Sequence, residues 1–176
     1  MKSKVISLCA VASSLVAILL TIGAYIEMAD VFMLVTASII VLLPLYYNSF
    51  KGSFLTFLVG GVIAVILSGF NFAVIFPAYF TFFGIYPVVR HKMLQKNIKN
   101  LTCIVVGLIW CIIAFYLCYL YCTVVLQMPI TDIPEQFAKY VVYLVGLLAV
   151  VFFFVFDRSV IVLKFTIDKT LRRIIK

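Results

Sequence analysis

Six long apolar runs constrain the fold of this chain more than any other feature of its sequence. They cover residues 5–25, 31–47, 53–68, 72–89, 101–126 and about 137–156. A helix needs roughly 20 mostly apolar residues to cross a bilayer, and a spanning segment must satisfy its backbone hydrogen bonds internally. The sequence therefore predicts an all-α bundle of six transmembrane helices. Six spans use about 120 residues, so we expect a single domain over residues 1–176, with no room for a separate soluble domain.

The first run could instead be a signal peptide, because Lys2 and Lys4 precede it. It is longer than the apolar core of a signal peptide, and no A-x-A cleavage site follows it. We therefore expect residues 5–25 to remain in the protein as its first span.

The charges predict the orientation of the spans through the excess of basic residues in cytoplasmic loops. With six spans and a cytoplasmic N-terminus, 13 of the 14 basic residues lie inside, and only Lys139 lies outside. Four of the six acids lie outside, namely Glu27, Asp30, Asp132 and Glu135. This sorting predicts that both termini are cytoplasmic.

Composition excludes the other broad classes of protein. The chain is 66% apolar and 11% charged, whereas soluble domains are about 45–50% apolar and about 25% charged. The net charge of +8 follows from the basic inner loops, which face anionic lipid headgroups. We therefore expect membrane lipids as partners, and no nucleic acid.

The end of the sixth span is open at the level of sequence, because Asp157 and Arg158 interrupt an apolar stretch. Either the span stops at Phe156, or it runs on to Leu163 with an Asp–Arg pair near the inner interface. Residues 157–176 form a basic amphipathic tail. Two interpretations of this tail are open: a helix lying on the inner leaflet, or an overhang of the last span.

The sequence carries little sign of catalysis or metal binding. The cysteines are Cys9, Cys103, Cys111, Cys118 and Cys122; three share a face of the fifth span, but cysteine in an apolar helix usually packs as a small apolar residue. His91 is the single histidine and lies in a basic run. No P-loop, H-E-x-x-H or G-x-S-x-G occurs, and no acid is expected at mid-membrane depth. We expect neither an enzyme nor a cofactor.

Two stripes of small residues predict close helix contacts, since small side chains let helix backbones approach in lipid. The first span has small residues at spacings of 3 and 4, and the third has them at a spacing of 4. Each stripe could pack within the chain or face a partner protein. The candidate docking residues are Ser7, Ala10, Ser14, Ala17, Thr21, Gly60 and Ala64.

The fourth span is rich in aromatic residues, and Pro77 should kink it. Acidic loops lie at the same predicted outer end. Two interpretations are open: an outward-facing pocket with aromatic walls, or an aromatic belt at the interface. The candidate substrate-binding residues are Asn71, Phe72, Phe76, Tyr79, Asp132, Glu27 and Asp30.

A short chain with six spans, both ends inside and a small-residue first span resembles the S components of energy-coupling factor transporters. Those subunits bind vitamins or metal ions at their outer side and dock on a coupling protein, which works with two ATPases. The docking motif of that family is A-x-x-x-A; the nearest matches here are Ala10-x-x-x-Ser14 and Ala17-x-x-x-Thr21. Residues 82–87 followed by Arg90 also resemble a segment of uncharacterised six-span bacterial membrane proteins. The resemblance implies a substrate-binding importer subunit in a bacterial cell membrane.

A second resemblance implies a different class of function. The rod-shape-determining membrane protein D family has a similar length and span count, and acts as a scaffold in cell-wall assembly. A scaffold needs small-residue faces and a basic inner surface, but no pocket. A further alternative is an accessory subunit of another membrane complex. The outer aromatic end is the feature that distinguishes a transporter subunit from these alternatives.

Overall fold

The computed structural model describes residues 2–47, 49–69, 74–96, 98–126 and 135–174, and these residues form helices with no strand among them. The α-helices are α1 (Lys2–Tyr25), α2 (Asp30–Val41), α3 (Phe50–Leu67), α4 (Ile75–Ala78), α5 (Tyr86–Gln95), α6 (Asn100–Val124) and α7 (Glu135–Ile174). The 3-10 helices are η1 (Glu27–Ala29) and η2 (Leu43–Tyr47), and η3 (Tyr79–Phe83) is a π-helical turn. The all-α prediction is thereby confirmed for the described part of the chain.

Four of the described helices are long and apolar enough to cross a membrane. They are Ser3–Tyr25, Phe50–Leu67, Asn100–Val124 and Tyr143–Val162. The predicted second and fourth spans are instead built from shorter pieces. The 12-residue α2 is followed by η2, and the fourth predicted run is divided among α4, η3 and α5.

Proline accounts for the interruption of the second run. Pro44 has no N–H to donate to the carbonyl four residues earlier, and the chain tightens there into η2, where the Leu45 N–H bonds to the Leu42 carbonyl at 3.0 Å. The bond spans three residues, as expected for a 3-10 turn. This α-helix therefore ends before the predicted boundary at residue 47.

In the fourth run, the irregular stretch lies after Pro77, between Tyr79 and Ile85. The Gly84 N–H bonds to the Tyr79 carbonyl at 2.9 Å, a π-type bond across five residues. Pro87, at the start of α5, cannot donate to the carbonyl four residues back, and such a proline favours the first turn of a new helix. Trp110 on α6 compensates part of the disturbance, because its Nε1–H donates to the Thr81 carbonyl at 2.9 Å.

The tightest packing in the fold joins α1 to α3. Gly60 lies directly against α1: a Cβ at this position would be 2.7 Å from Val16 Cγ1 and 3.2 Å from the Ser13 carbonyl oxygen. The Ser49 hydroxyl caps α3 by accepting a hydrogen bond from the Gly52 N–H at 3.1 Å. Gly69 ends the turn after α3 with φ = 65°, a conformation that glycine adopts without steric cost.

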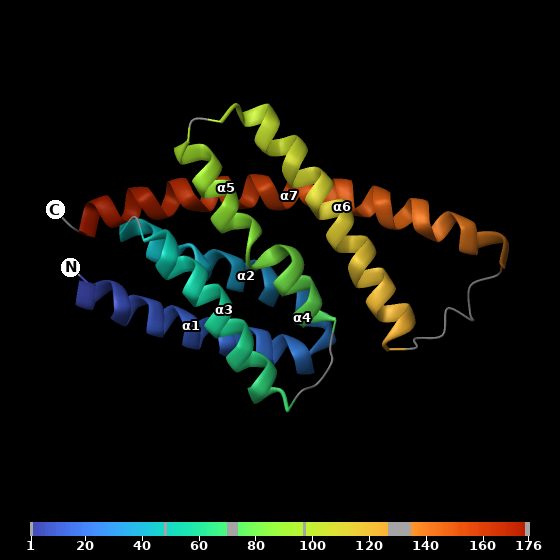
Figure 1. Cartoon of the computed structure of the whole chain (residues 1–176), viewed down its shortest axis with the longest axis horizontal. Helices are drawn as coiled ribbons and strands as arrows, with labels where there is room; N and C mark the ends of the chain where they lie inside the picture. Colours follow the sequence, from blue (N-terminus) through green and yellow to red (C-terminus); the bar gives the residue numbers. More distant parts are fainter. Residues whose placement is uncertain (1, 48, 70–73, 97, 127–134, 175–176) are drawn as a thin grey trace.

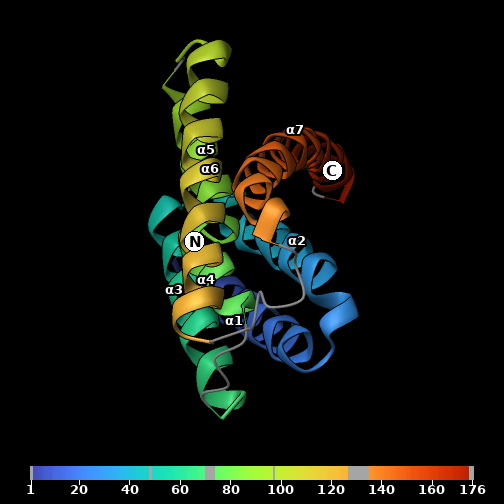
Figure 2. The ribbon, with the colours of Figure 1, turned by 90° about the vertical axis from the view of Figure 1, so that its right-hand side faces the viewer.

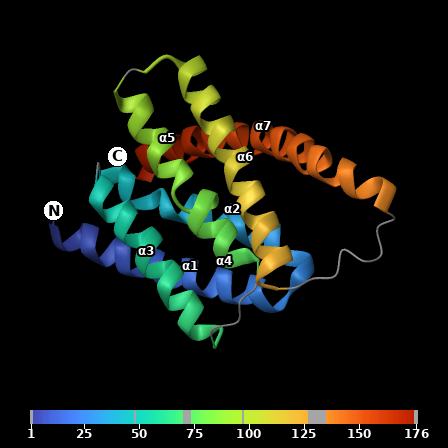
Figure 3. The same ribbon diagram turned by 45° about the vertical axis from the view of Figure 1, so that its right-hand side comes forward.

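Successive long segments run in alternating directions, and α1 begins at the same end of the molecule at which α7 ends (Figure 1). The turned views show α1, α2 and α3 grouped together, with α6 and α7 beside them (Figures 2 and 3). The 40-residue α7 continues through Asp157 and Arg158 without a break. It thus passes the point at which the sequence left the end of the last span open.

Candidate functional site

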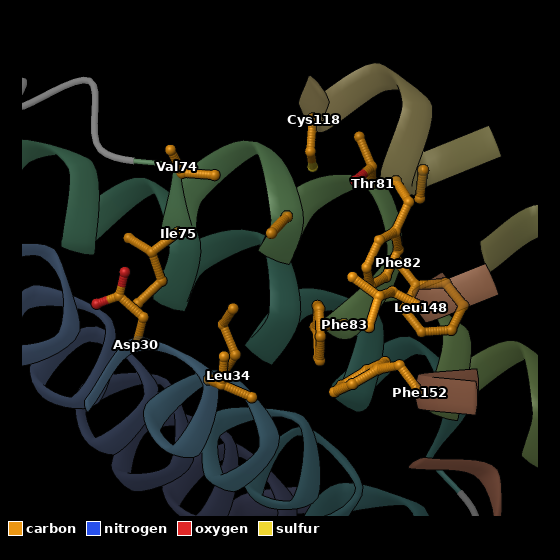
Figure 4. A pocket seen from close by; sticks show the side chains of 14 residues that line it. Asp30, Leu34, Val74, Ile75, Thr81, Phe82, Phe83, Cys118, Leu148 and Phe152 are labelled. Carbon is orange, nitrogen blue, oxygen red and sulfur yellow. The ribbon is translucent and has the colours of Figure 1, made fainter. Parts of the chain in front are cut away.

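A cavity of about 380 Å³ lies between α2, the α4–η3 segment, α6 and α7 (Figure 4). Each of these elements contributes side chains to its wall. The lining residues are Asp30, Val31 and Leu34 of α2; Val74, Ile75, Ala78, Thr81, Phe82 and Phe83; Ala114, Phe115 and Cys118 of α6; and Leu148 and Phe152 of α7.

The lining of the cavity is almost entirely apolar. Asp30 supplies the one carboxylate among its lining residues, and in Figure 4 it lies beside Ile75, at the opposite end from Leu148 and Phe152. The Thr81 hydroxyl donates to the Pro77 carbonyl at 2.6 Å, so its hydrogen is used within its own helix. The site can therefore enclose an apolar body.

Two lining residues of the cavity are largely exposed. Val31 is 57% exposed and Leu148 is 53% exposed, and they belong to α2 and α7. The exposed part of the lining therefore includes apolar side chains. Leu148 belongs to the helix Tyr143–Val162, which is long and apolar enough to cross a membrane.

Aromatic rings connect the cavity wall to a second feature deeper in the fold. The Phe83 ring contacts the Phe152 ring edge-on, with centroids 5.5 Å apart. On the other side, Phe82 stacks on Tyr86 at 4.8 Å, and Tyr86 contacts Phe153 edge-on at 5.8 Å. These contacts hold α7 against the η3–α5 segment.

The second feature is a buried ion pair between α5 and α7. Arg90 is 2% exposed and Asp157 is 4% exposed, and Arg90 Nε donates to Asp157 Oδ1 at 3.0 Å. The Tyr86 hydroxyl donates to the same oxygen at 2.6 Å. Arg90 Nη2 donates to Asn100 Oδ1 at 2.7 Å, which adds α6 to the network.

This network explains how an apolar bundle tolerates two buried charges. A buried charge is costly unless it is paired and hydrogen-bonded. Here the Asp157 carboxylate is held by Tyr86 and Arg90 of α5, and the guanidinium is also held by Asn100 of α6. Arg90 Nη1 is buried without a hydrogen-bond partner among the described residues. The arrangement links α5, α6 and α7.

The sequence alone does not reveal this ion pair. Arg90 is expected in the inner basic loop, with Arg158 as the charged neighbour of Asp157, whereas Arg158 is exposed in the structure. One signal was available, because an acid inside an otherwise apolar helix indicates a buried partner. Asp157 is such an acid, five residues before the end of the helix Tyr143–Val162.

The candidate substrate-binding residues are placed differently from one another. Asp30 lines the cavity. Phe76 and Tyr79 are buried in the core next to it, and the Tyr79 hydroxyl donates to the Phe57 carbonyl at 3.2 Å. Asn71, Phe72 and Asp132 lie outside the described residues. Glu27 lies in η1, and its side chain is outside the described part of the chain.

The candidate docking residues divide between the interior and the surface. Gly60 and Ala64 are buried, Gly60 against α1. On α1, Ala17 is buried and Thr21 is half-buried, while Ser7, Ala10 and Ser14 are exposed. The α1–α3 contact thus uses Ser13 and Val16 and leaves the first half of the stripe uncovered.

Cys111 and His91 each contact a neighbouring group of the chain. The Cys111 thiol, on α6, donates to the Ala149 carbonyl of α7 at 3.6 Å, and His91 contacts Gln95 at 3.0 Å. Among the described residues, no group of three His, Cys, Asp or Glu side chains could hold a metal ion.

Comparisons with models of protein families, with curated proteins and with solved structures gave no match.

Proposed function

We propose that this chain is a membrane-embedded subunit that binds a small molecule for import, similar in role to the S component of an energy-coupling factor transporter. The cavity is the observation that carries the proposal. Its volume of about 380 Å³ falls in the range of about 300–1,000 Å³ typical of small-molecule sites. It also has the usual composition of such sites, with apolar and aromatic walls. A scaffold has no need of such a cavity.

The proposal includes six crossings with both termini in the cytoplasm of a bacterial cell. The distribution of basic residues supports this orientation. The common end of α1 and α7 also supports it, since an even number of crossings returns the chain to its starting side (Figure 1). In this arrangement α2 with η2, and α4 with η3 and α5, form the second and fourth crossings.

Reporter fusions test this topology. A reporter that is active only in the cytoplasm should be active after Lys176 and near Lys96, and silent near Asp132, because the basic segments are retained inside. Reporter activity is measured in intact cells, with reporter protein levels as the control. Activity near Asp132 would contradict the six-span arrangement.

The exposed small face of α1 is the proposed docking surface for a coupling protein. Ser7, Ala10 and Ser14 lie on the surface, where small side chains allow a partner helix to approach closely. The Ser14 hydroxyl donates to the Ala10 carbonyl of its own helix at 3.0 Å. Shape, more than hydrogen bonding, is therefore expected to determine docking.

Copurification from the native cells in mild detergent tests the proposed function. We expect the tagged chain to retain a coupling protein and two ATPases. Ser14→Leu should release these partners because it blocks close approach, whereas Ser14→Ala should retain them. Leu15→Phe serves as a matched control, since it adds bulk at another exposed position of α1.

Each outcome of this experiment is informative. Retention of the partners by Ser14→Leu would contradict docking through this face. Wall-synthesis proteins in place of ATPases would contradict the importer and support a scaffold. Equal thermal stability of the purified Ser14→Leu and wild-type chains would show that the loss of partners is not a folding defect.

A further inference from the structure

We propose that the cavity binds an uncharged hydrocarbon body, and that the molecule taken up by this subunit is therefore apolar. This inference rests on the proposed function and names its class of substrate. A metal ion or a charged vitamin would need charged or polar groups that face it. The chemistry of the cavity wall, the packing of its rings and its volume all favour an apolar molecule instead.

The wall of the cavity presents almost no polar surface to a ligand. Among its lining residues, Asp30 and Thr81 are the two with an oxygen in the side chain. The Thr81 hydroxyl donates to the Pro77 carbonyl at 2.6 Å. The Asp30 carboxylate oxygens point away from Phe82 and Phe152 (Figure 4), and Asp30 has an interaction within the chain. A charged ligand would thus lie against apolar walls, which is costly.

Phenylalanine rings form one side of the cavity and hold one another in place. The Phe82 and Phe83 rings meet edge-on with centroids 5.6 Å apart. Phe152 contacts Phe83 at 5.5 Å and Phe115 at 5.7 Å, which joins η3, α6 and α7. A protein interior is packed more densely than an organic liquid, so it offers more van der Waals contacts to each carbon atom. An apolar molecule therefore gains contacts when it leaves the fluid hydrocarbon of the bilayer for this wall.

The volume of the cavity sets the size of the molecule. An apolar cavity of about 150 Å³ binds one benzene molecule, which has six carbon atoms. By the same ratio, the volume of about 380 Å³ corresponds to about 15 carbon atoms. A single chain or a single ring system has this size, whereas a whole phospholipid with two chains is too large.

Exposed side chains at the cavity allow such a molecule to arrive from the membrane. Val31 of α2 and Leu148 of α7 are largely exposed, and both line the cavity. Leu148 belongs to the helix Tyr143–Val162, which is long and apolar enough to cross a membrane. An apolar molecule concentrates in the bilayer because its surface is removed from water there. One chain of a membrane lipid has the same chemistry, so the experiment has to separate the two sources.

Photo-crosslinking in nanodiscs tests the inference. The probe is an uncharged alkane of about 15 carbon atoms with a diazirine at its middle, and crosslinked residues are mapped by mass spectrometry. We expect crosslinks to residues 74–83, 114–118 and 148–152. Unlabelled alkanes should compete more strongly as they lengthen to about 15 carbon atoms. Longer alkanes should compete no better, because the added carbons meet no wall.

Charged competitors test the preference for an uncharged molecule. An α,ω-diamine and an α,ω-dicarboxylate of the same length carry a charge at each end, so one charge has to enter the cavity. At equal concentrations measured in the membrane, both should compete about tenfold or more worse than the alkane, because a buried charge without a partner is costly. Competition by the diamine or the dicarboxylate that matches the alkane would overturn the inference.

Two variants locate the bound molecule. Ala78→Leu adds carbons to the cavity wall and should shift the length limit to alkanes shorter by about three carbon atoms, because the remaining space is smaller. Leu148→Trp should reduce crosslinking to residues 74–83. Leu147→Trp is the matched control, since Leu147 is also exposed but does not line the cavity. Because both leucines are exposed, the pair separates an effect on the cavity from an effect on folding.

Several other results would contradict the inference. An unchanged length limit in Ala78→Leu, or equal losses in Leu148→Trp and Leu147→Trp, would place the alkane outside the cavity. Competition that does not level off with length would indicate contact with the outer surface alone. A phospholipid with a diazirine in one chain that labels the cavity and is not displaced by the free alkane would show a lipid site. Failure of the importer assignment would appear separately, in the copurification experiment, which does not involve the cavity.

Discussion

Replacing Arg90 or Asp157 alone with leucine is expected to destabilise the folded chain by about 3–5 kcal/mol, since removing one partner of a buried pair leaves the other charge uncompensated. In Arg90→Leu, Asp157 keeps only the Tyr86 hydroxyl as a partner. In Asp157→Leu, the guanidinium keeps only Asn100. The free energy of unfolding can be measured by titration with sodium dodecyl sulfate in mixed micelles.

The double variant Arg90→Leu with Asp157→Leu gives the diagnostic result. Because no isolated charge remains, it should recover most of the stability that either single variant loses. Arg158→Met is the matched control, since Arg158 is the exposed neighbour of Asp157 and its loss should change stability by less than about 0.5 kcal/mol. Losses that simply add in the double variant would contradict an ion pair between α5 and α7.

Adding a single methyl group at Gly60 is expected to cost about 1–3 kcal/mol through overpacking. The new Cβ would be 2.7 Å from Val16 Cγ1, and the Ser13 carbonyl oxygen at 3.2 Å cannot rotate away. Combining Gly60→Ala with Val16→Ala should recover only part of the loss, because that backbone contact remains. The same unfolding titration measures the effect.

Gly146 provides the control for this prediction. A Cβ at Gly146 would be 3.4 Å from its nearest neighbour, the Tyr116 hydroxyl. Gly146→Ala should therefore be neutral or slightly stabilising, because alanine favours a helix over glycine. If Gly60→Ala cost no more than Gly146→Ala, the close approach of α1 and α3 would be refuted.

Hydropathy predicted the helical class and the four long helices, because apolar length is a local property of the sequence. It did not predict where α2 or the fourth run break, since those breaks depend on Pro44 and Pro87 and on what each turn packs against. Pro77 was predicted to kink the fourth run, and no break was predicted at Pro87. Pro77 and Pro87 both lack a backbone donor, but Pro87 lies in the first turn of the new helix α5.

Local sequence patterns also did not predict which side chains meet in the tertiary fold. A spacing of four predicted that Gly60 and Ala64 share a face, but periodicity does not say which helix covers that face. Asp30 is among the lining residues of the cavity, while Phe76 and Tyr79 from the same set of candidates are in the core. Arg90 and Asp157 are 67 positions apart, so only the tertiary fold brings them together.

The π-helical turn at Tyr79–Phe83 sets how the ion pair after it is oriented relative to the cavity wall. A π turn holds one residue more than an α turn, and each residue of an α-helix rotates the chain by about 100°. Without the extra residue, Arg90 would point about a quarter of a turn away from Asp157, while the residues before the turn kept their positions. The number of residues in this turn therefore sets the direction in which the side chains of α5 point. Deleting one residue there would turn Arg90 away from Asp157 while the cavity wall before the turn stayed in place, even though every remaining side chain were unchanged.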